Sequence, residues 1–80
     1  MKISIDHNSA IPLYLQIENQ LRNIIRDPEY KKGKMLPNEV DLSKQLGISR
    51  NTLRQAINNL VTEGLLVRKK GIGTIVVNQS

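Results

Sequence analysis

Two arginines and a pair of lysines are the residues of this sequence whose types and spacing could do chemistry. Arg50 and Arg54 stand four residues apart, and Lys69 and Lys70 lead into the tip Gly71-Ile72-Gly73. Side chains four apart share one face of a helix, and the arginine fork matches the O6 and N7 acceptors of guanine in a major groove. The pattern predicts contact with duplex DNA. A solvated helix edge is the alternative for the arginines, and protection of a strand edge is the alternative for the lysines.

The charge of the chain is concentrated around these residues. Residues 1–42 carry six basic and six acidic side chains, whereas residues 43–80 carry six basic side chains and Glu63 as the sole acidic one. The whole net charge of +5 therefore belongs to the C-terminal half. Such asymmetry indicates a polyanionic partner, although a solubilising surface explains the charge alone equally well.

Composition argues against several other classes of protein. The 80 residues include no Cys, Phe or Trp and a single histidine, His7, so no metal-ligand set is available. With Tyr14 and Tyr30 as the sole aromatic residues, single-strand binding by base stacking is disfavoured. No apolar run approaches the ~20 residues of a membrane span. No nucleophile has a base partner and no phosphate-cradling loop precedes a helix. We expect no enzyme, no cofactor, no metal, no membrane contact and a cytoplasmic location.

A first helix is predicted after an extended, frayed arm over residues 1–11. Pro12 suits the first helical position, because its missing N–H has no partner there in any case. Asp27-Pro28 should end the helix, since proline disfavours the helical conformation of the residue before it. Apolar residues at spacings of three and four mark one helix face, namely Tyr14, Ile17, Leu21, Ile24 and Ile25.

A short second helix is predicted from a capping pattern. Asn38 is the candidate N-cap, with Asp41 three residues on. Gly47 is the expected left-handed terminator. Val40, Leu42 and Leu46 should supply the apolar contacts of this helix.

The third predicted helix spans residues 50–63 and follows after a turn of three residues. Ser49 is its candidate N-cap and Gly64 its end. Two short helices joined by such a turn are typical of a helix-turn-helix. An apolar stripe of Leu53, Ala56, Ile57, Leu60 and Val61 should face the core, which leaves Arg50, Asn51, Arg54 and Asn58 outward.

The periodicity changes after Gly64. The segments LLVRKK and TIVVN are rich in apolar and β-branched residues, and GIG lies between them. This pattern predicts a hairpin over residues 65–77. The fold class is therefore mainly α with a small β-hairpin: a winged helix-turn-helix, made of three helices and a C-terminal wing.

Four blocks of the sequence resemble the DNA-binding domain of the GntR family of bacterial transcription regulators. They are PLYLQI, LPNE, LGISRNTLRQAINNLVTEGLL and KKGIGT, and they cover the chain from Pro12 to Val77. The resemblance implies a winged helix-turn-helix domain over residues 12–78 that binds an operator in double-stranded DNA, as part of a repressor. The helix block and the wing block are specific in combination.

The resemblance also implies site residues. Arg50 and Arg54 match the two operator-contacting arginines of the family. Small polar residues beside them, here Ser49, Asn51 and Thr52, face DNA in the family, and the matching wing tip, Lys70 and Gly71, approaches the minor groove. With their neighbours Lys69 and Gly73, the expected DNA-binding set is Ser49, Arg50, Asn51, Thr52, Arg54, Lys69, Lys70, Gly71 and Gly73.

Two positions depart from the family pattern. Val40 stands where the family has an operator-contacting arginine, so this part of the operator is read differently or not at all. Pro28 replaces a usual glycine and should stiffen the connector. Family members also continue into a C-terminal domain that binds a small-molecule effector and forms a homodimer on a palindromic operator. We expect that domain to lie outside this chain. The alternative function is a winged-helix protein–protein interaction module without DNA binding, but the outward face of the third helix offers no apolar residue for it.

Overall fold

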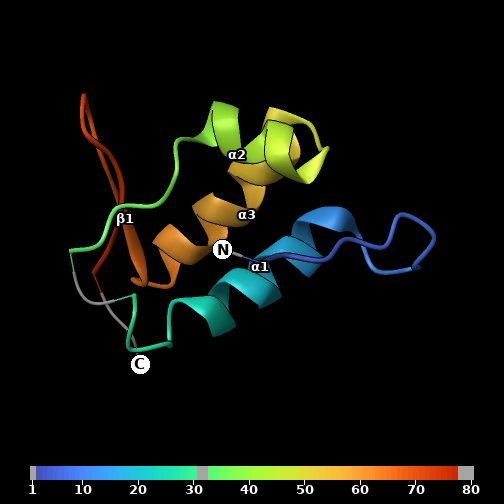
Figure 1. The fold of residues 1–80 in the computed structure, drawn as a ribbon, viewed down its shortest axis with the longest axis horizontal. Coiled ribbons are helices and arrows are strands. Elements are labelled where there is room, and N and C mark those ends of the chain that lie inside the picture. The colour runs from blue at the N-terminus through green and yellow to red at the C-terminus, as the bar shows by residue number, and fades with distance from the viewer. Residues whose placement is uncertain (1, 31–32, 78–80) are drawn as a thin grey trace.

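The computed structural model describes residues 2–30 and 33–77 and confirms the predicted fold class. Three helices precede a two-stranded antiparallel hairpin (Figure 1): α1 (Leu13–Ile24), α2 (Glu39–Leu46), α3 (Arg50–Thr62), β1 (Leu66–Lys69) and β2 (Gly73–Val76). The predicted limits at residues 1 and 78 lie outside the described residues.

Helix α3 is the centre of the fold, because it contacts α1, α2 and β1. Its predicted stripe faces inward: Leu53, Ala56, Ile57 and Leu60 are buried, and Val61 is half-buried against the core. Helix α1 covers the stripe with Ile17 and Leu21. Each fully buried aliphatic side chain contributes roughly 1.5–3 kcal/mol, so this stripe fixes the direction in which the opposite, polar face of α3 points.

Both predicted caps at the helix-turn-helix are confirmed. The Asn38 Oδ1 atom accepts from the Asp41 N–H at 2.8 Å, and the Ser49 Oγ atom accepts from the Thr52 N–H at 3.1 Å. Gly47 has φ 68°, the left-handed conformation that glycine adopts at low cost. These caps hold the start of α3 directly beside α2.

The prediction for α1 was wrong at both ends. Pro12 is the N-cap rather than the first helical residue: its ψ of 145° is extended, and its carbonyl accepts from the Leu15 and Gln16 N–H groups. The helix ends at Ile24, because the next turn tightens into bonds that span three residues, with the Asp27 N–H donating to the Ile24 carbonyl at 3.0 Å.

The N-terminal arm is docked rather than frayed. Two glutamines one turn apart on α1 pair with its backbone. Gln20 accepts from the Ser4 N–H at 2.8 Å and donates to the Ser4 carbonyl at 2.5 Å. Gln16 likewise accepts from the Asp6 N–H at 2.9 Å and donates to the Asp6 carbonyl at 3.0 Å. Because Ile3 and Ile5 also pack against the core, the arm is part of the folded domain.

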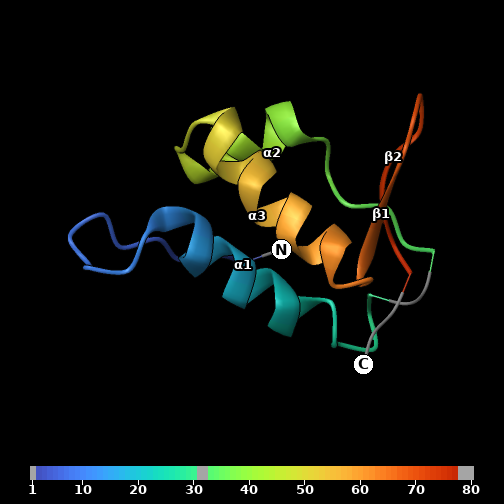
Figure 2. The same cartoon turned by 180° about the vertical axis from the view of Figure 1, so that it is seen from behind.

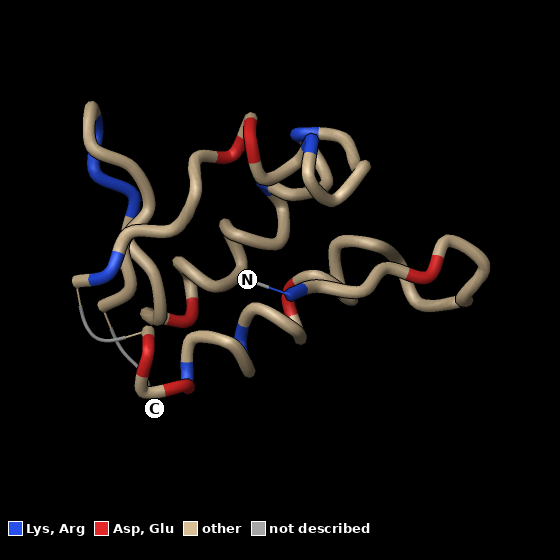
Figure 3. Tube along the Cα trace, in the orientation of Figure 1, with Lys and Arg blue, Asp and Glu red and all other residues tan. Residues whose placement is uncertain are grey.

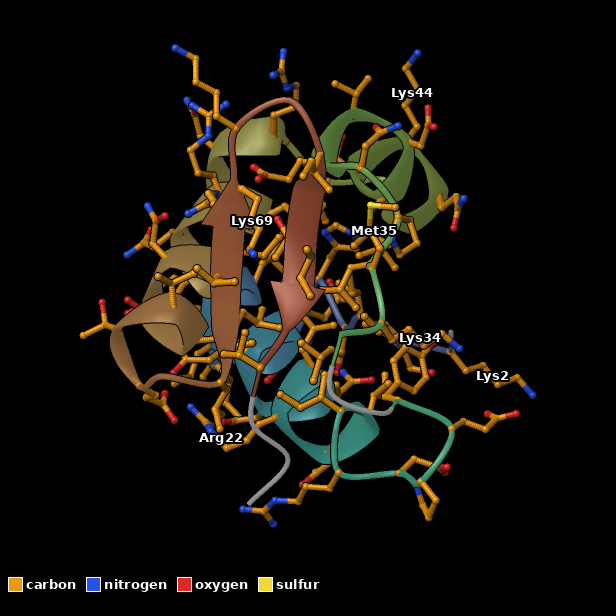
Figure 4. All side chains as sticks on the ribbon, turned by 90° about the vertical axis from the view of Figure 1, so that its left-hand side faces the viewer. Lys2, Arg22, Lys34, Met35, Lys44 and Lys69 are labelled. Atoms are coloured by element: carbon orange, nitrogen blue, oxygen red, sulfur yellow. The ribbon has the colours of Figure 1, made fainter. Side chains whose placement is uncertain are left out.

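The hairpin forms the wing, and its strands pair from Leu66 with Val76 to Lys69 with Gly73. The connector before α2 extends the pairing on the other side of β2, where the Leu36 N–H donates to the Thr74 carbonyl at 2.9 Å. Figure 4 shows Met35 on this side of β2, and Figure 2 shows the wing standing beside the start of α2. The base of the wing is thereby held on both sides while its tip projects.

Candidate nucleic-acid interface

Eight of the nine predicted DNA-binding residues line three open depressions that share lining residues. One depression is formed by Ser49, Arg50, Asn51 and Arg54. A second joins Arg50 and Arg54 to the start of α2 and to Arg68. A third combines Arg68 and Glu39 with the wing tip, including Lys69, Lys70, Gly71 and Gly73. We call this surface the basic face. It runs along the upper edge of Figure 1, from the start of α3 to the wing tip.

The arginines of α3 point outward as predicted. Arg50 is exposed, and the Arg54 side chain is 48% exposed. Ser49 and Asn51 are exposed beside them. Thr52, the predicted residue that does not line a depression, is half-buried, and its hydroxyl lies 2.8 Å from the Ser49 hydroxyl. Thr52 therefore orients the cap residue at the entry to α3.

The wing tip carries the second group of predicted residues. Lys69, Lys70 and Gly71 are exposed, whereas Gly73 is half-buried against Met35. The turn closes through a 3.0 Å bond from the Ile72 N–H to the Lys69 carbonyl, with Gly71 at φ 78°. Figure 3 shows the blue positions of the wing and of the helix ends around the α2–α3 turn along the same edge.

A carboxylate lies between the two basic groups, and the sequence prediction missed it. Glu39, the first residue of α2, places Oε1 3.6 Å from the Arg54 Nε atom and Oε2 3.1 Å from the Arg68 Nε atom. Arg68 also donates to Asn58 on α3 through Nη1. The predicted outward position of Asn58 is confirmed, and its partner is a wing arginine. Glu39, Arg54, Asn58 and Arg68 form the Glu39 network, which joins α2, α3 and the wing.

The sequence carried a signal for this network. Glu39 is acidic at the start of a helix that borders the most basic part of the chain, and Arg68 lies in a strand beside two other cations. Neither fact predicts that Glu39 pairs with Arg68, because the two residues are separated by 29 positions in the sequence.

The prediction that Val40 packs inward was wrong. Val40 is 37% exposed and lines the same depression as Arg50 and Arg54. Leu42 fills the core position instead, and Leu46 packs against the core at half-exposure. Since α2 has only eight residues, a single apolar face suffices to dock it, and Val40 falls beside that face.

A second ion-pair network lies at the other end of α3. Arg22 on α1 contacts the Glu18 carboxylate at 2.7 Å and the Glu63 carboxylate at 2.5 Å. Asn59 donates to the other Glu18 oxygen at 2.9 Å. We call these four residues the Arg22 cluster. Figure 4 shows Arg22 at the opposite end of the molecule from Lys44 on α2.

The Arg22 cluster shifts two pKa values. The hydrogen bond from Arg22 lowers the pKa of the Glu63 carboxyl, and the bond to Glu63 raises the pKa of the Arg22 guanidinium. Both shifts favour the charged forms. The cluster therefore joins α1 to the end of α3 as a charged pair throughout the neutral range.

Within residues 2–30 and 33–77, no group of three His, Cys, Asp or Glu side chains is placed to hold a metal ion. The helices of this described part are also too short and too polar for any of them to cross a bilayer.

The geometry can be compared with known proteins. The sequence model of one family, described as bacterial regulatory proteins, gntR family, matches residues 13–76. That match covers both networks, the helix-turn-helix and the wing. The chain belongs to the GntR family.

Individual GntR relatives agree with this assignment. The chain is 49% identical over 74 residues to the HTH-type transcriptional repressor NagR of Bacillus subtilis, covering 92% of this chain and 30% of NagR. It thus spans less than a third of the length of this curated relative. YtrA from Sulfolobus acidocaldarius, a GntR-family transcription factor, superposes with a TM-score of 0.87 at 36% identity, covering 98% of this chain and 82% of YtrA. The DNA-binding domain of AraR in complex with operator ORX1 superposes with a TM-score of 0.84 at 29% identity, covering 96% and 99%.

Proposed function

We propose that this GntR domain binds duplex DNA sequence-specifically and serves a bacterial transcription repressor. The observation that carries the proposal is the basic face, where the start of α3 and the wing tip form one continuous surface. NagR is named a repressor, and the AraR domain of similar fold is in complex with an operator.

The start of α3 fits a major groove. Arg50 and Arg54 rise about 6 Å apart along the helix, so both forks can reach base edges within one groove. Arginine bidentate to guanine O6 and N7 is the commonest specific contact. We assign base reading to these two arginines. Ser49 and Asn51, at the entry to the helix, contact the neighbouring phosphates and fix the register, and Thr52 orients the Ser49 hydroxyl between them.

The wing fits the adjacent minor groove. Lys69 and Lys70 are exposed point charges suited to phosphates or to a narrow, strongly negative groove. Gly71 at the tip carries no side chain, so the backbone can approach the sugar edges there, and Gly73 at the start of β2 leaves room for Met35 behind the wing. We assign Lys69, Lys70 and Gly71 to minor-groove and phosphate contacts, and we assign no cofactor to the domain.

For the whole regulator we propose a homodimer on a palindromic operator, with a small-molecule effector bound by another domain. The support is the family resemblance and the length of NagR, of which this chain matches 30%. Two linked domains would gain affinity because the second half-site binds intramolecularly.

The test is a selection from randomised duplexes, followed by titration of the winning duplex and a scrambled version at several salt concentrations. If about five to seven phosphates are neutralised, log K should fall with log salt at a slope of about −4 to −6. Enrichment of one sequence together with such a slope supports the proposal. No enrichment and a slope near zero would refute it and favour a protein-contact module.

A further inference from the structure

We propose that Glu39 is a positioning residue for DNA reading: it directs the Arg54 guanidinium and ties the wing to α3. This inference rests on the proposed function. Glu39 divides its two oxygens between two arginines from different elements, with Oε1 3.6 Å from the Arg54 Nε atom and Oε2 3.1 Å from the Arg68 Nε atom. One side chain thus contacts both parts of the basic face.

The contact with Arg54 is made at the side of the guanidinium. Glu39 approaches the Nε atom. The two terminal nitrogens of Arg54 stay available to donate hydrogen bonds to the O6 and N7 atoms of a guanine. A long side chain that is 48% exposed otherwise samples many rotamers, which must be lost on binding. Glu39, whose side chain is 20% exposed, forms an ion pair with Arg54 on this side and so favours one direction of the guanidinium before DNA binds.

The contact with Arg68 extends this order to the wing. Arg68 is a β1 residue whose Nε donates to Glu39 and whose Nη1 donates to Asn58 on α3. Its remaining Nη2 atom is buried without a hydrogen-bond partner, so among the described residues Glu39 and Asn58 are the two acceptors that hold this guanidinium. Removing the Glu39 charge should therefore loosen the angle between the wing and α3.

The charge of Glu39 has the wrong sign for binding DNA. A carboxylate on the basic face repels phosphates and lowers affinity for every sequence. If it also directs Arg54, its removal should act on two quantities in opposite directions. Affinity for random duplex should rise, while discrimination of the selected duplex from random duplex should fall.

Asp41 provides a matched control. It is exposed, lies in the same first turn of α2, and lines the same depression, but its carboxylate accepts from the Asn38 side chain at 2.8 Å. Asp41→Asn removes the same charge from the same helix end and leaves the contacts of Arg54 and Arg68 in place. Both variants lose a favourable charge at a helix N-terminus, so both should lose similar stability.

The experiment compares wild type, Glu39→Gln and Asp41→Asn on the selected duplex and its scrambled version. Both variants should bind the scrambled duplex about threefold more tightly, because each removes one negative charge near the phosphates. Only Glu39→Gln should lower the ratio of the two affinities, by about threefold to tenfold, which is part of the discrimination of one bidentate arginine. An unchanged ratio in Glu39→Gln, or an equal fall in Asp41→Asn, would overturn the proposal.

A measurement on the free protein separates this inference from the proposed function. In ¹⁵N-labelled protein, the Nε–H resonances of Arg54 and Arg68 should be resolved in wild type and in Asp41→Asn, and should shift toward the position of free arginine in Glu39→Gln. Resonances that do not change would show that Glu39 directs neither side chain, whatever the DNA result. If the resonances shift but wild type selects no duplex, the proposed function fails, and the reading role of Glu39 fails with it.

Discussion

The two ion-pair networks of this domain differ in the ratio of their charges. In the Arg22 cluster one arginine serves two carboxylates, Glu18 and Glu63. In the Glu39 network one carboxylate serves two arginines, Arg54 and Arg68. The Arg22 cluster has more negative than positive charge, and it holds α1 to the end of α3. The Glu39 network has a net positive charge on an open surface, and a net positive charge attracts an anionic ligand.

This comparison gives a way to tell a stabilising network from a binding one within a single helix. Both networks include residues of α3, and both join it to another element. A residue of the Arg22 cluster should affect folding and leave DNA discrimination unchanged. A cation of the basic face should do the reverse.

The largest effect is expected for Arg54→Ala. A bidentate arginine contributes roughly 1–3 kcal/mol of discrimination, so affinity for the selected duplex should fall about fivefold to a hundredfold and affinity for scrambled duplex much less. Preference at one base pair, expected to be a guanine, should relax. The unfolding temperature should stay within the range of Gln55→Ala, an exposed neighbour that serves as control. Equal losses on both duplexes would make Arg54 a phosphate contact and contradict the assignment.

Arg22→Ala should lower stability and leave DNA discrimination unchanged. It removes the cation from Glu18, whose side chain is 10% exposed, and leaves that carboxylate with Asn59 as its hydrogen-bond donor. The cost should be about 1–3 kcal/mol of unfolding free energy, measured by urea denaturation, while the affinity ratio of the two duplexes stays constant. Arg26→Ala, an exposed arginine one turn on, should cost less than about 0.5 kcal/mol. A changed affinity ratio in Arg22→Ala would break the separation of the two networks.

Lys70→Ala should have a smaller effect, and the effect should be general. Loss of one point charge at the wing should weaken all duplexes about equally and reduce the magnitude of the salt slope by about one. Lys34→Ala removes the same charge from the connector, where the ammonium lies 4.4 Å from the centre of the Tyr30 ring, and should leave the slope unchanged. A sequence-dependent loss in Lys70→Ala would instead show that the wing reads bases.

The smallest effect concerns the pH dependence of stability. Arg22 lowers the pKa of Glu63, so the folded protein holds this carboxylate charged at lower pH than the unfolded chain does. The stabilisation by Glu63 is then complete above the unfolded pKa of about 4.3 and is lost as the pH falls through the lower folded value. Because the Glu63 side chain is 39% exposed, solvent screening keeps the term below about 1 kcal/mol. The difference in unfolding free energy between wild type and Glu63→Gln should shrink below pH 4.5. In an Arg22→Ala background that pH dependence should vanish, and its persistence there would assign the shift to another group.

The sequence predicted the helix-turn-helix well because its signals are local. The caps at Asn38 and Ser49 and the glycine terminator at Gly47 each act within four residues of the structure they fix, and all three are confirmed. The outward direction of Arg50 and Arg54 follows from the buried stripe on the same helix, so it was predictable for the same reason. The DNA contacts assigned to these residues remain predictions.

Apart from the two ends of α1, the errors and omissions arise where residues distant in the sequence decide the outcome. The arm could not be read as docked, because its hydrogen-bond partners, Gln16 and Gln20, follow it by 10 and 16 residues. Val40 has an apolar side chain typical of a core, but Leu42 fills the core position of this short helix and Val40 lies beside it. The role of Glu39 depends on a wing residue 29 positions away. Local chemistry fixed the elements, whereas the networks between them required the three-dimensional arrangement.

The docked arm has a consequence for the timescale of motion at this end of the molecule. A side-chain amide carries both a donor and an acceptor, so Gln20 and Gln16 satisfy the N–H and the carbonyl of one arm residue each, as a neighbouring strand would. The amide protons of Ser4 and Asp6 should then exchange with solvent only when the arm separates from α1, although the arm forms no regular strand. A glutamate at position 20 would keep the acceptor and lose the donor, a change of one atom. Gln20→Glu would thus break the bond to the Ser4 carbonyl, keep the bond from the Ser4 N–H and leave the Gln16 bonds to Asp6 in place.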